Sequence, residues 1–448
     1  MLIEPARCQA LFDQVADASR ALGIPDVEAI VAAGSSALTR FANNAIHQNV
    51  AERSRHLSVR VQIDGRTARA TTNRFDDASI RQVVEEAVVL TKLQESDPAL
   101  LPLGGPMPAP LVKRWYQATA AVTPAARAAA VAEAIALVEE AGQTAAGIYS
   151  TSEAVFALLN SRGVFAWYPE TMANFSITAM AADSSGWAKA SACSHYDLDP
   201  VAMARAAAGK AHFSREPVEL PPGPYTVILE PAAVLDLAGQ MFGDFSATAI
   251  SDGRSFLRDR MGQKLFGDNI TIYDDAVHPL QSGAPFDGEG VPRQRLALVH
   301  QGVVKDVAYC RQAAHAAGVP PTGHGFPLPN ESGEAPMNIV IAGGDTPLET
   351  MIASTARGIL VTRLWYIREV DPYEKIMTGM TRDGTFLIED GRLSRGVRNF
   401  RFNQALPEML SHVEALSPAV RASGEEAFDM VVPAMKVRGF HFTEVTRF

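Results

Sequence analysis

Residues 285–318 read PFDGEGVPRQRLALVHQGVVKDVAYCRQAAHAAG and contain the pattern that decides the fold class. Within them, Arg295–Tyr309 form two β-rich runs on either side of Gln301-Gly302, which predicts a hairpin. The same pattern recurs at Asp64-Gly65, between HLSVRVQ and RTARATT, and at Asp390-Gly391 within TFLIEDGRLSRGV. Hairpins without regularly alternating helices favour an α+β fold over a doubly wound α/β sheet.

Two proline-rich joints divide the chain into three parts. LPLGGPMPAP at residues 101–110 and EPVELPPGP at residues 216–224 have the composition of linkers. We therefore expect an N-terminal α/β subdomain over residues 1–105, a middle α/β subdomain over 111–216 and a C-terminal β-rich domain with a few helices over 222–448. Several domains agree with the length, because 448 residues are too many for one hydrophobic core.

Charge and cysteine usage restrict the partners and the compartment. The net charge is −10 with a pI near 5.5, which argues against direct binding to nucleic acid or to an anionic membrane. The N-terminus lacks the basic start and apolar run of a signal peptide. The most apolar long stretch, residues 119–142, carries too many charges to span a membrane. Because three scattered cysteines predict no disulfide framework, we expect a cytoplasmic protein.

The sequence holds no close set of zinc ligands. Catalytic zinc usually takes three protein ligands, two of them commonly from one helical turn. No two of the ten histidines lie three to five residues apart, so H-E-x-x-H and its one-residue-longer variant are absent. Cys310, His315 and His324 form the only short cluster of soft ligands, and their spacing matches no common metal site. We therefore predict no metal in this chain.

Several segments resemble the TldD/TldE (PmbA) metallopeptidase family. Residues 285–318 are similar to the family's D-x-E-G-x-P hairpin, and TGHG around His324 to its S-T-G segment. VILEPAAVLDLAGQMFGDFSATAISDGRSFLRDRMGQ, residues 227–263, resembles the strand–helix–S-F-L run of the TldE/PmbA branch. TGMTRDGTFLIEDGRLSRGVRNFRF and VVPAMKVRGFHF resemble the family's later hairpin and closing strand. The N-terminal half matches more loosely, through FANNAIHQNVAERSRHLSVRVQIDGRTARATT.

The resemblance implies an N-terminal α/β region and a C-terminal β-rich domain in one half of a cytosolic peptidase. In this family TldD and TldE form a heterodimer that cleaves unfolded peptides, including leader segments of ribosomal peptide antibiotics. TldD carries H-E-x-x-x-H on the helix after the YTVILE-like strand, with a cysteine ligand near its C-terminus, and TldE lacks that motif. Members were first named as modulators of DNA gyrase.

In this chain the positions of the zinc motif are degenerate. An ungapped placement from Pro231 puts Gly239, Gln240 and Asp244 where His, Glu and His would stand, and no cysteine follows Cys310. Without these groups nothing could lower the pKa of a bound water toward 7. A packed amphipathic helix explains the same segment, because an apolar stripe alternates with a polar face of Asp236, Gln240 and Asp244.

Three hypotheses follow from these patterns. The first is a non-catalytic TldE/PmbA-like subunit, with zinc held by a TldD-like partner and with exposed strand edges that bind an extended, unfolded peptide. On this hypothesis we expect the peptide channel to be lined by Asp287, Glu289, His324 and Arg363. The second is an independently active metallopeptidase that uses the cluster of Cys310, His315 and His324. The third is a stand-alone binding module for a peptide or for a protein such as gyrase or a toxin–antitoxin protein. Without a TldD-like partner, a homodimer becomes the favoured assembly.

Overall fold

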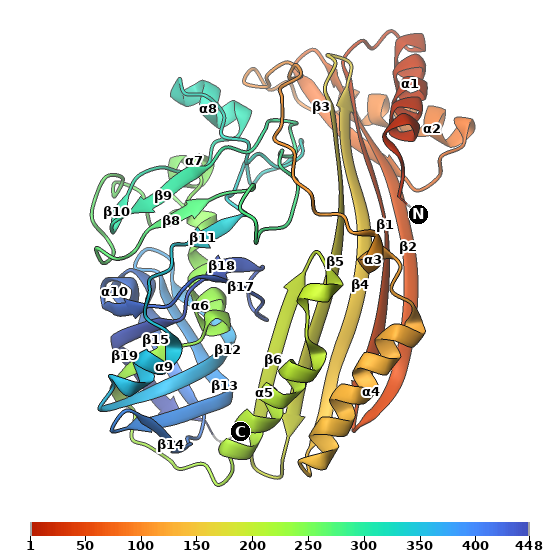
Figure 1. The fold of residues 1–448 in the computed structure, drawn as a ribbon. Coiled ribbons are helices and arrows are strands. Elements are labelled where there is room, and N and C mark those ends of the chain that lie inside the picture. Colours follow the sequence, from red (N-terminus) through yellow and green to blue (C-terminus); the bar gives the residue numbers. More distant parts are fainter. Residues whose placement is uncertain (1, 447–448) are drawn as a thin grey trace.

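The computed structural model describes residues 2–446 and consists of three β-sheets with helices packed on them (Figure 1). Strand residues outnumber helical residues, 39% against 24%, which confirms the predicted α+β class. No helix within residues 2–446 is both long enough and apolar enough to cross a membrane. The division of the chain into three domains stays a prediction.

The first sheet has six strands in the order β3-β2-β1-β4-β5-β6 and is antiparallel throughout. Asp64 and Gly65 connect β2 to β3 as predicted, with φ angles of 48° and 72°, the left-handed values that a type I′ turn requires. Residues on both sides of the first proline-rich joint contribute to this sheet, because β1 pairs with β4. The strands are β1 (Val27–Ala42), β2 (Ala45–Ile63), β3 (Arg66–Thr72), β4 (Thr144–Asn160), β5 (Phe165–Met180) and β6 (Ser185–Ala192).

Two helix pairs cover one face of this sheet at opposite ends (Figure 1). Ala157 of β4 packs under α1 (Pro5–Ala21) and α2 (Asp77–Lys92), whereas Tyr149 packs under α4 (Pro124–Glu140) and α5 (Pro200–Phe213). Because side chains alternate along a strand, these two odd-numbered residues lie on the same face. The even-numbered side chains face the C-terminal half, where Phe156 stacks on Phe286 with ring centroids 5.9 Å apart. A short helix, α3 (Gln117–Ala120), precedes α4.

The second sheet is a closed barrel. Its order is β12-β7-β19-β15-β13, and β12 pairs with β13 to complete the ring. Phenylalanines fill the interior, and the rings of Phe400 and Phe442 stack with centroids 4.5 Å apart. The strands are β7 (Gly223–Leu229), β12 (Arg357–Asp371), β13 (Ile376–Glu389), β15 (Phe400–Ala405) and β19 (Met435–Val445), with β14 (Arg392–Gly396) on β13 and β16 (Val413–Leu416) on β19.

The third sheet has the order β10-β9-β8-β11-β18-β17 and shares one hydrophobic core with the barrel. The predicted hairpins at Gln301-Gly302 and Asp390-Gly391 are confirmed as the β9–β10 and β13–β14 connections. The strands are β8 (Ile272–Asp274), β9 (Leu296–His300), β10 (Val303–Val304), β11 (Ile339–Ile341), β17 (Val420–Ala422) and β18 (Met430–Val432). The remaining short helices of the C-terminal half are α7 (Ala247–Ser251), α8 (Arg311–Ala317), α9 (Leu348–Ala353) and α10 (Leu406–Ser411).

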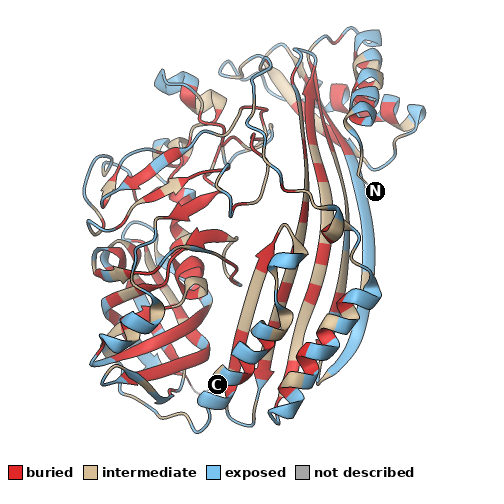
Figure 2. Ribbon diagram, viewed as in Figure 1, coloured by how far each residue is buried: buried red, intermediate tan, exposed pale blue. Residues whose placement is uncertain are grey.

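The helix after β7 is shorter than the sequence suggests. α6 (Pro231–Ala238) ends where Gly239 begins a 3₁₀ segment, η2 (Gly239–Asp244), so the stretch 231–244 is not one α-helix. A 3₁₀ turn is common at the end of an α-helix, and glycine favours the change because its helix propensity is low. α6 packs against β7 and β12 of the barrel and β17 and β18 of the third sheet, and Figure 2 shows it as mainly buried.

The apolar stripe of this helix gives a stability prediction. Leu237→Ala should lower the free energy of unfolding by about 2–5 kcal/mol, because its side chain is fully buried and its removal leaves a cavity. Leu111→Ala is the matched control, because Leu111 is fully exposed, and should change stability by less than about 0.5 kcal/mol. Urea denaturation measures both variants. Equal stabilities would contradict the assignment of Leu237 to the core.

Candidate functional site

The polar face of α6 is covered by residues 424–427 of the same chain. The buried carboxylate of Asp236 accepts hydrogen bonds from the backbone amides of Glu425 and Glu426, both at 2.9 Å. The side-chain amide of Gln240 donates to the carbonyl of Glu426 at 3.2 Å. The face that carries the degenerate motif therefore holds a neighbouring segment in place.

Gly239 is a position of close packing. A Cβ atom there would lie 2.4 Å from the Cβ of Ala427 and 3.0 Å from the Cε of Met430. Real Cβ atoms essentially never show contacts under 3.0 Å, so a side chain at this position would have to displace Ala427. A histidine at position 239 consequently has no room in this arrangement.

Asp244 at the end of η2 forms a buried ion pair. Its carboxylate lies 2.5 Å from the Nζ of Lys375, which also contacts Glu369 at 2.6 Å. The other carboxylate oxygen accepts from the amide of Phe256 at 3.1 Å. Burial raises the pKa of Asp244, although Lys375 and the Phe256 amide oppose the shift. Asp244 thus connects η2 to the β12–β13 hairpin and to the following loop.

Asp287 and Glu289 lie on one tight turn before β9. Asp287 accepts from the amides of Glu289 and Val291, both at 2.9 Å, and from the amide of Gly325 at 2.7 Å. Burial raises its pKa, and the three amides oppose that shift. Because its carboxylate oxygens are used by the backbone, Asp287 stabilises the turn and joins it to the loop after α8.

Glu289 has fewer partners than Asp287. One carboxylate oxygen accepts from the amide of Arg311 at 2.8 Å, and the side chain borders a cavity. Burial raises the pKa of Glu289 to about 7. The hydrogen bond from the Arg311 amide opposes this shift, and the neighbouring charge of Asp287 adds to it.

His324 is buried between two partners. Its Nε2 lies 3.1 Å from a carboxylate oxygen of Asp274, and its Nδ1 lies 2.9 Å from the hydroxyl of Thr322. Burial alone would raise the pKa of Asp274, but the contact with His324 holds it below its usual value. Asp274 also accepts from the amides of Met337 and Asn338 at 2.7 and 2.6 Å. His324 therefore supports the end of β8 and, through Asp274, the residues just before β11.

The cluster of Cys310, His315 and His324 does not form a ligand set. Cys310 is the N-cap of α8 and accepts from the amide of Ala313 at 3.4 Å. Burial, helped by Glu334, raises the pKa of the Cys310 thiol to about 12. Within residues 2–446, no three His, Cys, Asp or Glu side chains are grouped so that they could hold a metal ion.

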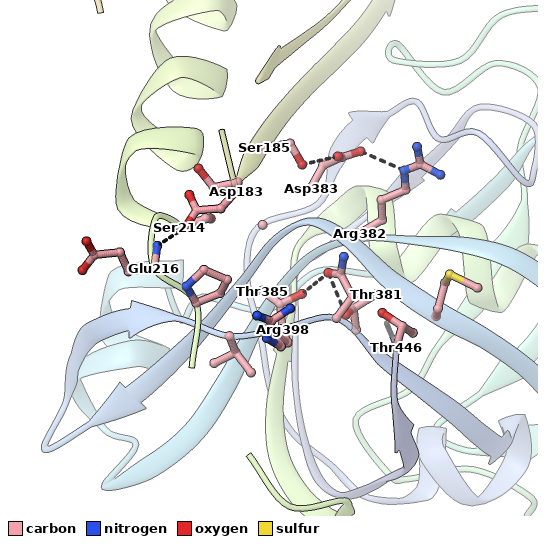
Figure 3. A pocket seen from close by; sticks show the side chains of 16 residues that line it. Asp183, Ser185, Ser214, Glu216, Thr381, Arg382, Asp383, Thr385, Arg398 and Thr446 are labelled. Atoms are coloured by element: carbon pink, nitrogen blue, oxygen red, sulfur yellow. Dashed lines mark hydrogen bonds and ion pairs between the residues drawn. The ribbon is translucent and has the colours of Figure 1, made fainter. Parts of the chain in front are cut away.

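Arg363 lies apart from the other candidates, where the barrel meets β6. Its Nε donates to Asp383 at 2.8 Å, and its guanidinium lies 4.7 Å from the ring centroid of Trp187. Ser185 of β6 donates to the same Asp383 at 2.6 Å (Figure 3). Arg363 therefore joins the first sheet to the barrel.

A polar cleft of about 570 Å³ opens beside this ion pair (Figure 3). Thr381 and Thr385 both donate to the side-chain oxygen of Asn399, at 3.3 and 3.2 Å. The cleft is lined by hydroxyl and charged side chains from β6, β13, the loop after α5 and the connection between β14 and β15, among them Ser185, Ser214, Thr381, Arg382, Thr385 and Arg398. Much of its polar surface is already paired within the chain.

The candidates thus fall into three places. Asp287, Glu289 and His324 gather around the turn before β9, whereas Arg363 lies at the β6–barrel junction and Gln240 on the covered face of α6. The sequence did not single out the central residue, Asp236. Its place on the polar face of the amphipathic pattern was the available signal, but its partners are 189 and 190 residues away.

The packing at Gly239 can be tested with a matched glycine. Gly239→Ala should lower the free energy of unfolding by about 1–3 kcal/mol, because the added methyl overlaps Ala427. Gly243→Ala in the same 3₁₀ segment should be neutral or stabilising by up to about 1 kcal/mol, since nothing lies within 4 Å of its Cβ position. Chemical denaturation compares the two. A Gly239→Ala variant as stable as the parent would refute the close contact.

Asp236 gives a prediction for pH. Burial raises its pKa to about 6, against the hydrogen bonds from Glu426 and Glu425, and one of its oxygens has no hydrogen-bond partner among residues 2–446. Between pH 4 and 7 the Asp236 carboxyl ionises at a lower pH in the unfolded chain than in the folded one. The unfolded chain then binds fewer protons, so the contribution of Asp236 to the free energy of unfolding falls as the pH rises. Because asparagine does not titrate, the free energy of unfolding of Asp236→Asn relative to the parent should increase by about 1–3 kcal/mol between pH 4 and pH 7.

The exposed carboxylate of Asp345 is the control, and Asp345→Asn should show no such trend. Denaturation midpoints at several pH values measure both variants. A stability difference between Asp236→Asn and the parent that does not depend on pH would contradict the raised pKa.

Known proteins of one family resemble this chain along most of its length. Residues 27–90 match the PmbA/TldA metallopeptidase domain 1, residues 121–212 the central domain and residues 222–444 the C-terminal domain. A metalloprotease of Methanothermobacter thermautotrophicus is 23% identical over 61% of this chain and 62% of its own length. The metalloprotease PmbA of Escherichia coli O157:H7 is 23% identical over 48% of this chain and 45% of its own. The chain therefore matches less than two thirds of either relative.

Solved structures with the same fold agree with this relationship. TldE from Thermococcus kodakarensis superposes with a TM-score of 0.88 at 20% identity, over 97% of this chain and 100% of that one. A candidate modulator of DNA gyrase from Thermotoga maritima gives 0.87 at 19% identity, with the same coverage. At this identity the superpositions establish the fold, and the three domain matches establish the relationship that the sequence motifs indicated. The chain belongs to the PmbA/TldD metallopeptidase family.

Proposed function

We propose that this chain is the zinc-free, TldE-like subunit of a two-subunit peptidase, in which a TldD-like partner holds the catalytic zinc. The observation that carries the proposal is the packing of Gly239 against Ala427. The helix face that would present a zinc motif is instead covered by residues 424–427, which Asp236 and Gln240 hold in place. The chain then contributes surface to the complex, and the partner contributes the chemistry.

A long strand edge supports a role in binding extended chains. β3 pairs with β2 only from Leu57 to Ile63, so residues 45–56 of β2 have no partner strand on their outer side among residues 2–446. This stretch is mainly exposed, as Figure 2 shows. Unpaired backbone amides and carbonyls accept an added strand, which gives an unfolded peptide or a partner subunit a place to pair.

The two other hypotheses receive less support. An active site built on Cys310, His315 and His324 would have to break the contacts of His324 with Asp274 and Thr322. It would also need a thiolate from Cys310, but burial raises the pKa of this thiol to about 12. A stand-alone binding module uses the same strand edge and differs only in needing no partner subunit.

Metal content and pairing test the proposal together. The purified chain, reloaded with zinc and dialysed, should hold far less than one zinc per chain by elemental analysis. Co-expressed with a TldD-like paralogue, it should elute from size exclusion as one complex, because obligate interfaces bury more than about 2,000 Å². The zinc should belong to the paralogue.

A zinc-binding variant of this chain is the positive control for the metal measurement, for example one with an added terminal histidine tag. One tightly held zinc in the untagged chain would refute the zinc-free role. Separate elution at micromolar concentration would refute the heterodimer and leave a homodimer or a stand-alone module.

A further inference from the structure

A second cavity, of about 640 Å³, lies away from the α6 face. It is open to solvent and lined mainly by α7, α8, the turn that carries Glu289 and the loop of residues 326–333. Its volume lies in the range of small-molecule sites. Apolar side chains form much of the wall, among them Ile250, Met261, Val307, Phe326 and Leu328.

Glu289 is the buried charge in this wall. The residue is 7% exposed, and its Oε2 accepts from the Arg311 amide while its Oε1 has no hydrogen-bond partner among residues 2–446. A second buried glutamate, Glu334, differs because both of its oxygens are used, by Ser246, Thr248 and the amide of Cys310. Glu289 therefore borders a cavity with a largely apolar wall and has one carboxylate oxygen without a hydrogen-bond partner in the described part of the chain.

The other charges of the cavity have the same sign as Glu289. Asp252 and Glu331 also line it, Asp252 being paired with Arg254 at 2.8 Å, and no lysine or arginine within residues 2–446 lines it. Two arginines close to Glu289 are engaged elsewhere, since Arg60 pairs with Glu28 at 3.0 Å and the guanidinium of Arg311 donates to Pro102. An anionic ligand would be repelled, and a neutral apolar ligand would leave the carboxylate unpaired at a cost.

We infer that this cavity binds an ammonium or guanidinium group on an apolar stem, as a lysine or arginine side chain of a peptide presents it. The cation pairs with Oε1 of Glu289, and the apolar wall takes the alkyl stem. That the source is a peptide rests on the proposed function, whereas the cation chemistry rests on the cavity alone. Free alkylamines share this cation chemistry but lack a peptide backbone.

Calorimetric titration of the chain alone tests the cavity. Nα-acetyl-lysine methylamide, which keeps its side-chain ammonium, should bind. Nα-acetyl-norleucine methylamide has a similar stem without the charge and should bind at least about tenfold more weakly. n-Butylamine supplies the cation without a peptide backbone. Binding of butylamine as tightly as the lysine probe would assign the site to free amines. Binding of neither cation, or equal binding of the lysine and norleucine probes, would overturn the inference.

Variants locate the binding. Glu289→Gln should weaken the lysine probe by about tenfold or more while keeping an acceptor for the Arg311 amide. Glu349→Gln, at an exposed glutamate on α9, is the matched control and should change nothing. Ala313→Phe fills the cavity without removing the carboxylate and should also abolish binding, which covers the case in which Glu289→Gln fails to fold. Loss of binding in Glu331→Gln but not in Glu289→Gln would place the cation at the rim and refute the assignment.

The pH dependence gives an independent readout. Because only the ionised carboxylate pairs with a cation and its pKa is about 7, affinity for the lysine probe should fall about tenfold from pH 8 to pH 6. Asp287, Arg311 and Arg60 set the local field, and the other titratable groups on the wall are Asp252, Tyr309, Cys310, His315 and Glu331. A His315→Gln variant should keep the trend. If the pH trend disappears in His315→Gln and persists in Glu289→Gln, the titrating group is His315 and the role of Glu289 is overturned.

These measurements do not depend on the partner subunit. If the chain pairs with a TldD-like paralogue but no cation binds, the inference fails and the proposed function stands. If the lysine probe binds but no paralogue pairs, the proposed function fails and the cavity stands as a cation site.

Discussion

The buried carboxylate of Asp236 is the contact on which the arrangement of the three sheets depends. It holds residues 425 and 426 against α6, which lies between the barrel and the third sheet. The same segment reaches the first sheet, because Lys189 of β6 lies 3.2 Å from Glu425 and Ser191 of β6 donates to Asp429. Burial of this charge costs stability, as its raised pKa indicates, but two amide hydrogen bonds offset part of the cost. One short segment thereby ties the first sheet to α6.

Local features of the fold were predictable, and long-range pairings were not. The three hairpins carry residues with positive φ at their turns, so their position follows from two neighbouring residues. The pairing of β1 with β4 brings Ile30 opposite Leu158, and no pattern near either residue specifies it. Closure of the barrel through β12 and β13 also depends on strands whose order the sequence does not encode locally. The α+β class could therefore be predicted, whereas the sharing of one sheet by two segments could not.

The candidate site divides in the same way. The absence of a zinc motif at residues 239–244 follows from residue identity alone, but the reason that glycine occupies position 239 lies in Ala427, far along the chain. Asp287 and His324 are of residue types that are common in functional sites. Their contacts are structural, because Asp287 accepts three backbone amides and His324 is buried against Asp274. Composition cannot distinguish a polar residue that serves the backbone from one that faces a ligand, since the difference lies in the surrounding chain.

Asp236 and Glu289 show how the surroundings make that difference. Burial raises the pKa of both carboxyls, so the shift alone does not separate a structural role from a binding role. Asp236 is closed in by its neighbours: a Cβ on Gly424 would lie 2.0 Å from its carboxylate, which leaves no room for a ligand. Glu289 instead borders a cavity with one oxygen unpaired. Under the proposed function, a zinc-free subunit can still select what reaches its partner, because recognition needs only a cavity and a charge, whereas hydrolysis needs the ligands that α6 lacks.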